Sequence, residues 1–126
     1  MTAKEIQKYK KKSIPQLIKI ATLHFNRHIR ERDKLKGCIS CGGGVVENAG
    51  HYLNAGQNSH VRFNEKNVHG QCIACNKWKH GNLIEYRKGL VHKIGESEVL
   101  KLEFTPKTNF KWDRFSLIQT ILKYKK

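Results

Sequence analysis

Residues 38–82 read CISCGGGVVENAGHYLNAGQNSHVRFNEKNVHGQCIACNKWKHGN, and this stretch decides the fold. It holds all four cysteines of the chain as two Cys-x-x-Cys pairs with 30 residues between them: Cys38, Cys41, Cys72 and Cys75. A two-residue gap allows both thiolates of a pair to reach one ion from a tight turn, and two pairs complete a closed tetrahedral site. The spacing therefore predicts one structural Zn²⁺, ahead of two alternatives, disulfides or an iron–sulfur centre.

The charge of the chain favours a polyanionic partner. Lys and Arg number 25 against 10 Asp and Glu, a formal net charge of +15 over 126 residues, which is the size of one domain with a modest core. Such a charge promotes salt-sensitive association with DNA, ribosomal RNA or an acidic membrane. No apolar run is long enough to span a bilayer, and no signal-peptide pattern follows the Lys-rich start. We therefore expect a cytoplasmic protein with no membrane role, whose reduced cysteines bind metal.

The flanking segments predict helices. Residues 1–12 are Lys-rich and predict a solvated basic tail, or an arm that contacts phosphate. A basic helix is predicted over 13–33, because Ser13 and Gln16 have capping-box spacing and Pro15 lies in the first turn. Its apolar face has helical spacing and consists of Ile14, Leu17, Ile18, Ala21, Phe25 and Ile29.

Residues 37–81 predict a zinc-bound core in which a strand from Val45 to Leu53 and a second strand at 61–63 form a hairpin with a wide loop. A short helix should follow over 72–79. Residues 82–126 predict C-terminal helices: one from Leu83 closed by Gly95, an ambiguous segment at 97–104, a linker at 106–109, and a last helix capped by Asp113. The residues expected to face inward from that last helix are Phe115, Ile118, Ile121 and Leu122. The whole chain is predicted to be a single α+β domain.

Three polar residues, His51, Asn67 and Asn76, lie on this strand–loop–strand–helix path, which would bring them together. The segment resembles the ββα-metal core of HNH nucleases. The resemblance implies that His51 is the general base, that Asn67 steadies the loop and the histidine, and that Asn76 ligates a catalytic Mg²⁺ or Mn²⁺. Phosphodiester hydrolysis needs both a base active near neutral pH and a cation on the scissile phosphate. The alternatives are a structural His51 and asparagines that serve as turn and cap residues.

One position departs from the common HNH pattern, because Gly50 stands where many members have a metal-ligating Asp or His before the base. His60, His69 or Asn48 could supply the missing ligand. Each of these could equally be an ordinary surface or hairpin residue.

The flanking blocks narrow the resemblance. In order, they are FNRHIRERD at 25–33, CISCG at 38–42, AGHY at 49–52, RF at 62–63, NVH at 67–69, QC at 71–72, CN at 75–76 and GN at 81–82. Over residues 14–95 the chain is similar to the NinG (Rap) family of recombination endonucleases of lambda-like bacteriophages, in which Gly also precedes the histidine. The resemblance implies a structure-selective DNA endonuclease that cleaves branched recombination intermediates such as Holliday junctions and D-loops. It also implies action in the cytoplasm of the bacterial host, possible recombination-protein partners of host or phage, and a possible homodimer, because a resolvase must cut two strands.

The residues expected to contact DNA are basic: Arg27, Arg30, Arg32, Arg62, Lys77 and Lys79. The alternative function is a non-catalytic, basic zinc-ribbon protein that binds DNA or RNA and whose His51 is structural. A second, exchangeable divalent-metal site beside His51 would distinguish the nuclease from this binding module. A protein–protein adaptor is disfavoured, because interface cores are depleted in charged residues.

Overall fold

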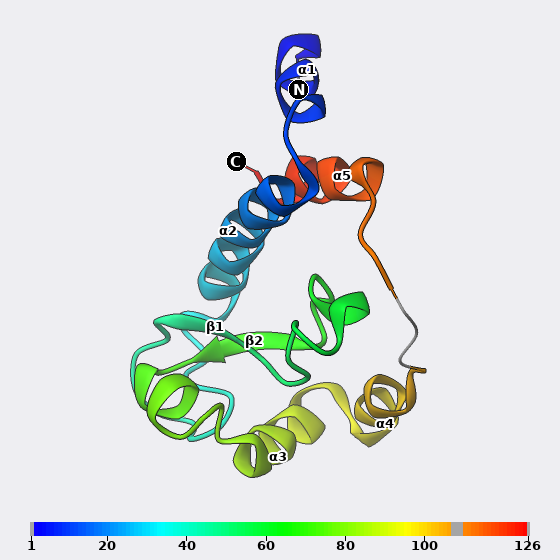
Figure 1. The fold of residues 1–126 in the computed structure, drawn as a ribbon. Helices are drawn as coiled ribbons and strands as arrows, with labels where there is room; N and C mark the ends of the chain where they lie inside the picture. Colours follow the sequence, from blue (N-terminus) through cyan, green and yellow to red (C-terminus); the bar gives the residue numbers. More distant parts are fainter. Residues whose placement is uncertain (1, 107–109, 126) are drawn as a thin grey trace.

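The computed structural model describes residues 2–106 and 110–125 and has the predicted mixed architecture, helices around one small antiparallel sheet (Figure 1). Its elements in chain order are α1 (Ala3–Lys10), α2 (Ile14–Asp33), β1 (Asn48–His51), η1 (Ser59–Val61), β2 (Val68–Gln71), η2 (Ala74–Trp78), α3 (Leu83–Ile94), α4 (Glu96–Phe104) and α5 (Arg114–Tyr124). The η1 segment is a 3₁₀ turn, and η2 is a short π-helix in place of the predicted helix over 72–79. The linker predicted at 106–109 falls mostly on residues 107–109, which lie outside the described residues.

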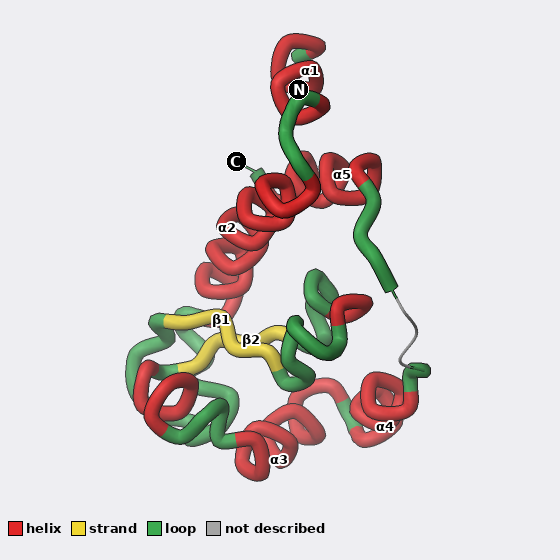
Figure 2. The backbone as a smooth tube through the Cα atoms, in the orientation of Figure 1, coloured by secondary structure: helices red, strands yellow, loops and turns green. Residues whose placement is uncertain are grey.

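The sheet lies between two groups of helices, with α2 and α5 on one side and α3 and α4 on the other (Figure 2). β1 and β2 pair antiparallel, with His51 opposite Val68. Phe25 of α2 packs in one buried cluster with Val68. On the other side, the Tyr86 hydroxyl of α3 donates to the Gly50 carbonyl at 2.7 Å. The two-stranded sheet is therefore held from both sides.

The second strand is β2, not the predicted segment at 61–63. Val61 is only 3% exposed, but its side chain is buried by packing under the third helix and not by strand pairing. Turns surround it, because the Oδ1 atoms of Asn54 and Asn64 accept backbone N–H groups at 2.8 and 2.9 Å. Asparagine side chains that imitate backbone turns here override the strand preference of β-branched and aromatic residues.

The helix predicted over 13–33 is confirmed as α2. Ser13 Oγ accepts from the Gln16 N–H at 3.3 Å, and Gln16 Oε1 accepts from the Ser13 N–H at 2.9 Å, which completes the capping box. Along one face of the helix, four apolar side chains are fully buried: Leu17, Ala21, Phe25 and Ile29. The last residue, Asp33, is also buried, at 1% exposure.

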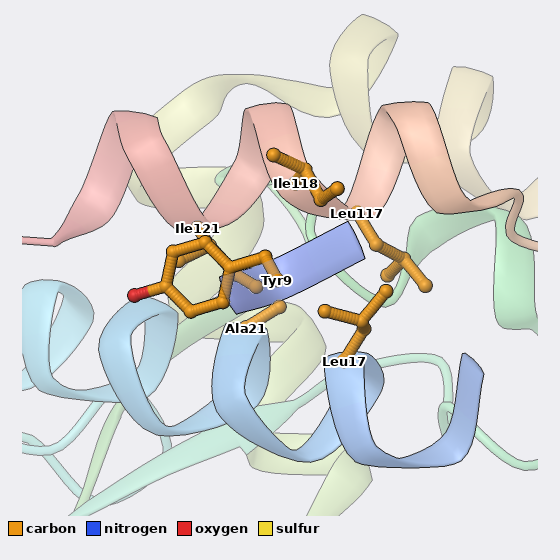
Figure 3. Packing of buried hydrophobic residues seen from close by; sticks show 6 residues of the cluster. All are labelled: Tyr9, Leu17, Ala21, Leu117, Ile118 and Ile121. Carbon is orange, nitrogen blue, oxygen red and sulfur yellow. The ribbon is translucent and has the colours of Figure 1, made fainter. Parts of the chain in front are cut away.

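Residues 3–10 form α1 in place of the predicted solvated tail. Thr2 Oγ1 caps the helix by accepting from the Glu5 N–H at 3.2 Å, and Tyr9 is only 4% exposed. The tyrosine anchors α1 on the rest of the protein, where Lys125 Nζ lies 3.0 Å from its hydroxyl. Figure 3 shows the cluster that surrounds Tyr9, made of Leu17, Ala21, Leu117, Ile118 and Ile121. One aromatic residue among the lysines thus orders the segment.

The last helix, α5, begins at its predicted cap, where Asp113 Oδ1 accepts from the Ser116 N–H at 2.7 Å. The prediction that Phe115 faces inward was wrong, because this side chain is 70% exposed. The inward face consists of Leu117, Ile118, Ile121 and Tyr124. A residue two positions before Leu117 points to nearly the opposite side of a helix.

The predicted helix from Leu83 is confirmed as α3, with Gly95 at its end at φ +91°. The ambiguous segment after it is helical and forms α4. Together with η1, these two helices enclose a third buried cluster: Val61, Tyr86, Leu90, Val99 and Leu102. Within residues 2–106 and 110–125, no helix combines the length and apolar character needed to cross a membrane.

Candidate metal centre and active site

The four cysteines converge in one cluster. Their Sγ atoms all lie within 4.8 Å of one another, and the Sγ atoms of Cys41 and Cys72 are 3.8 Å apart. A tetrahedral Zn²⁺ with Zn–S bonds of about 2.3 Å requires sulfur–sulfur separations of about 3.8 Å. The cluster therefore fits a zinc ion with four thiolates and no open position. Among the described residues it is the only group of three or more His, Cys, Asp or Glu side chains close enough to share a metal.

Local backbone structure presents both cysteine pairs. The chain reverses after Cys38 through Gly42, whose φ of +77° lies in the left-handed region, and the Gly42 N–H donates to the Cys38 carbonyl at 2.8 Å. On the other side, the Cys75 N–H donates to Cys72 Sγ at 3.5 Å, and Asn82 Nδ2 donates to Cys75 Sγ at 3.5 Å. Donors aimed at sulfur favour the thiolate, the form that binds metal.

Burial and nearby N–H groups shift the pKa values of Cys38 and Cys75 in opposite directions. Burial acts to raise the pKa of Cys38, but the N–H groups of Cys41, Cys72 and Ser40 lower it to about 7. Burial raises the pKa of Cys75 to about 12. A divalent cation would favour the thiolate at all four positions, with release of protons.

His51 ends β1 beside a surface pocket of about 360 Å³. Its Nε2 lies 2.9 Å from the carbonyl oxygen of Arg62. A carbonyl can only accept, so Nε2 bears the proton and Nδ1 keeps a lone pair. Burial holds the pKa of His51 below its usual 6.5, so the ring is neutral at neutral pH. This is the protonation state that a general base requires.

Asn76 lines the same pocket as His51. It lies in η2 directly after Cys75, and its Nδ2 donates to Asn48 Oδ1 at 2.9 Å. That bond orients the amide and leaves its Oδ1 without a partner among the described residues. Amide oxygen and imidazole nitrogen can both ligate divalent ions. Asn48, considered above as a ligand, instead supports Asn76.

Asn67 is fully buried and organises the loop behind His51. Its Nδ2 donates to the carbonyls of Leu53 at 3.0 Å and Val61 at 3.3 Å, and its Oδ1 accepts from the Leu53 N–H at 2.9 Å. Its own carbonyl accepts from the Tyr52 N–H at 2.8 Å. Asn67 is therefore placed to position residues 51–53 and not to touch a substrate.

The two other histidines suggested as metal ligands do not line the pocket. His69 is paired with Gly50, so its side chain leaves the sheet on the face opposite to that of His51. It is 2% exposed beside the Tyr86 hydroxyl, and burial lowers its pKa to about 3. His60 lies on η1, and its buried Nε2 has no hydrogen-bond partner within the described part of the chain. Neither histidine is placed to share an ion with His51.

Close packing explains the glycine before His51. A Cβ atom on Gly50 would lie 1.7 Å from Oε1 of Gln71. Gln71 is fully buried, and its Nε2 donates to Ser40 Oγ and to the Gly81 carbonyl, both at 2.8 Å. A metal-ligating side chain therefore has no room at position 50.

His80 was not among the predicted site residues, but it lines the pocket together with His51 and Asn76. It is exposed, has a φ of +50° and lies two residues after the end of η2. Its imidazole could ligate a divalent ion together with His51 and Asn76. The available signal was its short distance in the sequence from Cys75 and Asn76.

Arg32, one of the residues predicted to contact DNA, is tied into the fold, and its side chain is 22% exposed. Its Nε and Nη2 donate to the two carboxylate oxygens of Asp33, both at 2.8 Å. It also donates to the carbonyls of Glu65 at 3.1 Å and Val68 at 2.8 Å. The guanidinium thereby fastens the end of α2 to β2.

The other basic residues predicted to contact DNA differ in exposure, because the two lysines are exposed and the three arginines are partly buried. Arg27 and Arg30 line a shallow surface depression on α2. Lys77 and Lys79 are exposed on and beside η2, and neither forms an ion pair within residues 2–106 and 110–125. Arg62 is half-buried, and its carbonyl is the group that binds His51.

Comparison with known proteins gave one family. The family model described as "Bacteriophage Lambda NinG protein" matches residues 1–126. "Protein ninG" of Escherichia phage lambda is 44% identical over 88 residues, which cover 68% of this chain and 43% of that protein. "Protein ninG" of Salmonella phage P22 is 43% identical over 88 residues, with the same two shares. The chain thus matches less than half the length of these relatives. No solved structure matches the chain.

Proposed function

The chain belongs to the family described as Bacteriophage Lambda NinG protein, and we propose that it is a metal-dependent, HNH-like endonuclease that cleaves branched DNA. One observation carries the proposal: His51, with its Nδ1 unprotonated, lines one pocket with Asn76 and His80. The cysteine cluster joins the segment before the strand of His51 to the helix of Asn76. This arrangement supports a ββα-metal core.

In the proposed reaction, Nδ1 of His51 takes a proton from a water molecule as the water oxygen attacks the scissile phosphorus. The Arg62 carbonyl keeps the ring oriented and stabilises the positive charge that the ring gains. Asn76 and His80 are the residues that would hold the catalytic ion, with Asn48 orienting the amide. Bound Mg²⁺ or Mn²⁺, which keeps several waters of its own, would offset the charge that builds on the 3′ leaving oxygen.

Branched DNA is the proposed substrate because the accessible basic residues are suited to phosphate contacts. Such contacts position a protein but do not read sequence, so selectivity must come from DNA shape. A branch point offers flexed, partly unstacked strands that deform more easily than intact duplex. We propose that the protein acts in the cytoplasm of the infected cell, as two copies on a junction that needs two cuts, with phage or host recombination proteins as possible partners.

The decisive experiment measures cleavage of an end-labelled four-way junction, with and without Mg²⁺ or Mn²⁺. His51→Ala should reduce the rate at least 100-fold, because a general base contributes about 10²–10⁴-fold. Its zinc content and its junction affinity in EDTA-free, magnesium-free buffer should not change. His92→Ala removes an exposed histidine of α3 outside the pocket and should cut at the wild-type rate.

Two outcomes would contradict the proposal. Cleavage by His51→Ala at the wild-type rate would remove His51 from the mechanism. A wild-type protein that binds junctions but cuts none of them with any divalent ion would be the non-catalytic zinc protein instead. Competition among a four-way junction, a D-loop and a linear duplex of equal length tests the substrate separately. If the linear duplex is cut as fast as the branched forms, branch selectivity fails while the nuclease proposal stands.

A further inference from the structure

Trp78 is an exposed aromatic residue beside the candidate active site. Trp78 is 78% exposed, whereas tryptophans in folded proteins are usually largely buried. The other tryptophan behaves in the usual way: Trp112 packs edge-on against Phe63 and Phe110, and its Nε1 donates to the Ser59 carbonyl at 2.9 Å. The exposure of Trp78 is therefore not explained by the packing of the core.

The position of Trp78 is fixed relative to the pocket. It is the last residue of η2 and lies two residues from both Asn76 and His80 in the sequence. Those two residues line the pocket, whereas Trp78 does not line it. Because Trp78 is exposed and does not line the pocket, its indole lies outside the pocket on the same short segment. Backbone bonds fasten this turn, among them Lys79 N–H to the Ala74 carbonyl and Gly81 N–H to the Cys75 carbonyl, both at 2.9 Å.

The surroundings of Trp78 are cationic. Lys77 and Lys79 flank it, both are exposed, and within the described part of the chain neither has an acidic partner. This differs from the apolar groove lined by α3, where Arg87 is bonded to Glu103 and Lys88 to Glu85. An aromatic face between two uncompensated cations fits a nucleic-acid strand, which has a base to stack and phosphates on either side.

We propose that Trp78 is a stacking platform for an unpaired DNA base near the scissile phosphate, with Lys77 and Lys79 contacting the adjacent phosphates. This inference rests on the proposed function and names how a branched substrate is recognised. Bases in an intact duplex have both faces covered by their neighbours, whereas a flap or an opened branch point offers a free face. Stacking on one aromatic side chain therefore strengthens binding of unpaired strands and leaves binding of intact duplex nearly unchanged.

The test measures binding without a catalytic divalent ion, so that no probe is cut. The probes are a single-stranded oligonucleotide, a duplex with a single-stranded flap, and a blunt duplex of matched length. In a Trp112→Phe background, Trp78 is the only tryptophan, and its fluorescence should be quenched by the single strand and the flap but not by the blunt duplex. Trp78→Ala should lower the affinity for the single strand and the flap by at least about tenfold. Its affinity for the blunt duplex should stay within twofold of that of the protein that retains Trp78. Trp78→Phe should retain most of the affinity.

Phe104→Ala is the matched control, because Phe104 is 79% exposed on α4 and lies outside the pocket. This variant should bind all three probes like the wild type, and the zinc content of every variant should be unchanged. Equal weakening of flap and blunt duplex by Trp78→Ala, or no weakening at all, would overturn the stacking role. Because the readout is binding, it separates the two proposals: a wild type that binds flaps through Trp78 but cuts nothing contradicts only the nuclease, whereas a nuclease indifferent to Trp78→Ala contradicts only the platform.

Discussion

Asp33 is the buried anion that fastens α2 to the strand beside the candidate active site, and we expect Asp33→Ala to destabilise the protein severely. The carboxylate is 1% exposed. It accepts from Arg32 at 2.8 Å through each oxygen, from the Gly70 N–H of β2 at 2.8 Å and from Lys93 of α3 at 3.2 Å. It therefore joins two helices to the strand that pairs with the strand of His51.

The size of the effect follows from what the substitution leaves behind. Removing one partner of a buried ion pair costs about 3–5 kcal/mol. Arg32 keeps its bonds to two backbone carbonyls, so the low end of that range applies, and the unsatisfied Gly70 N–H adds about 1 kcal/mol. We expect a loss of about 4 kcal/mol, close to a thousandfold in the folding equilibrium. Because small domains are stable by about 5–15 kcal/mol, the variant should be folded but marginal.

Urea unfolding followed by circular dichroism, with zinc in fixed excess, measures the free energy of unfolding. Asp33→Asn should lose less than Asp33→Ala, because the amide oxygen can still accept from the Gly70 N–H. Glu98→Ala is the surface control: Glu98 pairs with Lys66 at 2.8 Å and with Lys101 at 3.3 Å near solvent, so its midpoint should not move. The slope m should be the same in all variants.

An Asp33→Ala protein with the wild-type midpoint, or with a free energy of unfolding within about 1 kcal/mol of the wild-type value, would refute this expectation. Such a result would mean that Arg32 and Lys93 find other partners or reach water. A second check uses acid. Although burial acts to raise the pKa of Asp33, the bonds from Arg32 and Gly70 hold it well below its usual 3.8. The stability that Asp33 contributes is complete above that value and should be lost only as the pH falls below it.

Three further predictions concern the site. Cys41→Ser should abolish zinc binding, measured by elemental analysis, and unfold the chain, because structural zinc contributes about 10–16 kcal/mol; a folded, metal-free variant would contradict this. His69 has a pKa of about 3 in the folded protein against a usual 6.5, so the unfolded state binds its proton first as the pH falls. Between pH 7.5 and 5.5, wild type should therefore lose about 1.4 kcal/mol more than His69→Phe; parallel losses in urea melts would refute it. Asn67→Ala removes three hydrogen bonds and should lower the free energy of unfolding by about 2–4 kcal/mol. The variant should also cleave junctions more slowly at saturating metal, and an unchanged rate would show that the loop does not position His51.

Several features could be predicted from the sequence because their causes are local. The capping box of Ser13 and Gln16, the Asp113 cap and Gly95 at the end of α3 each act within a few residues. The cysteine cluster was also predictable, since two short spacings leave few alternatives to one shared ion. The strand–loop–helix order also predicted that His51 and Asn76 would lie near each other, and both line one pocket.

Other features depend on distant partners and gave no local signal. β2 has the polar sequence VHGQ, yet all four residues are buried. His69 and Gln71 find their partners across the chain in Tyr86 and Ser40. Arg32 has the appearance of one more basic residue on a basic helix, and only the buried carboxylate of its neighbour shows that it is structural. Periodicity reports amphipathic faces, but it cannot identify a polar group that is buried with its partner.

The same distinction applies to the proposed active site of this small protein. His51 ends a strand that is paired along only four residues, and Asn76 lies on a five-residue helix, so neither element would be stable alone. The cysteine cluster and the buried polar network supply the missing rigidity, one by joining η2 to the segment before β1, the other by joining β2 to α2 and α3. Residues far from the pocket should therefore affect its geometry more than exposed neighbours do. Trp78 differs from these buried residues, because it is exposed at the edge of the rigid unit. Substitution of Trp78 should therefore leave the stability of the fold unchanged and affect only the binding of a ligand that contacts it.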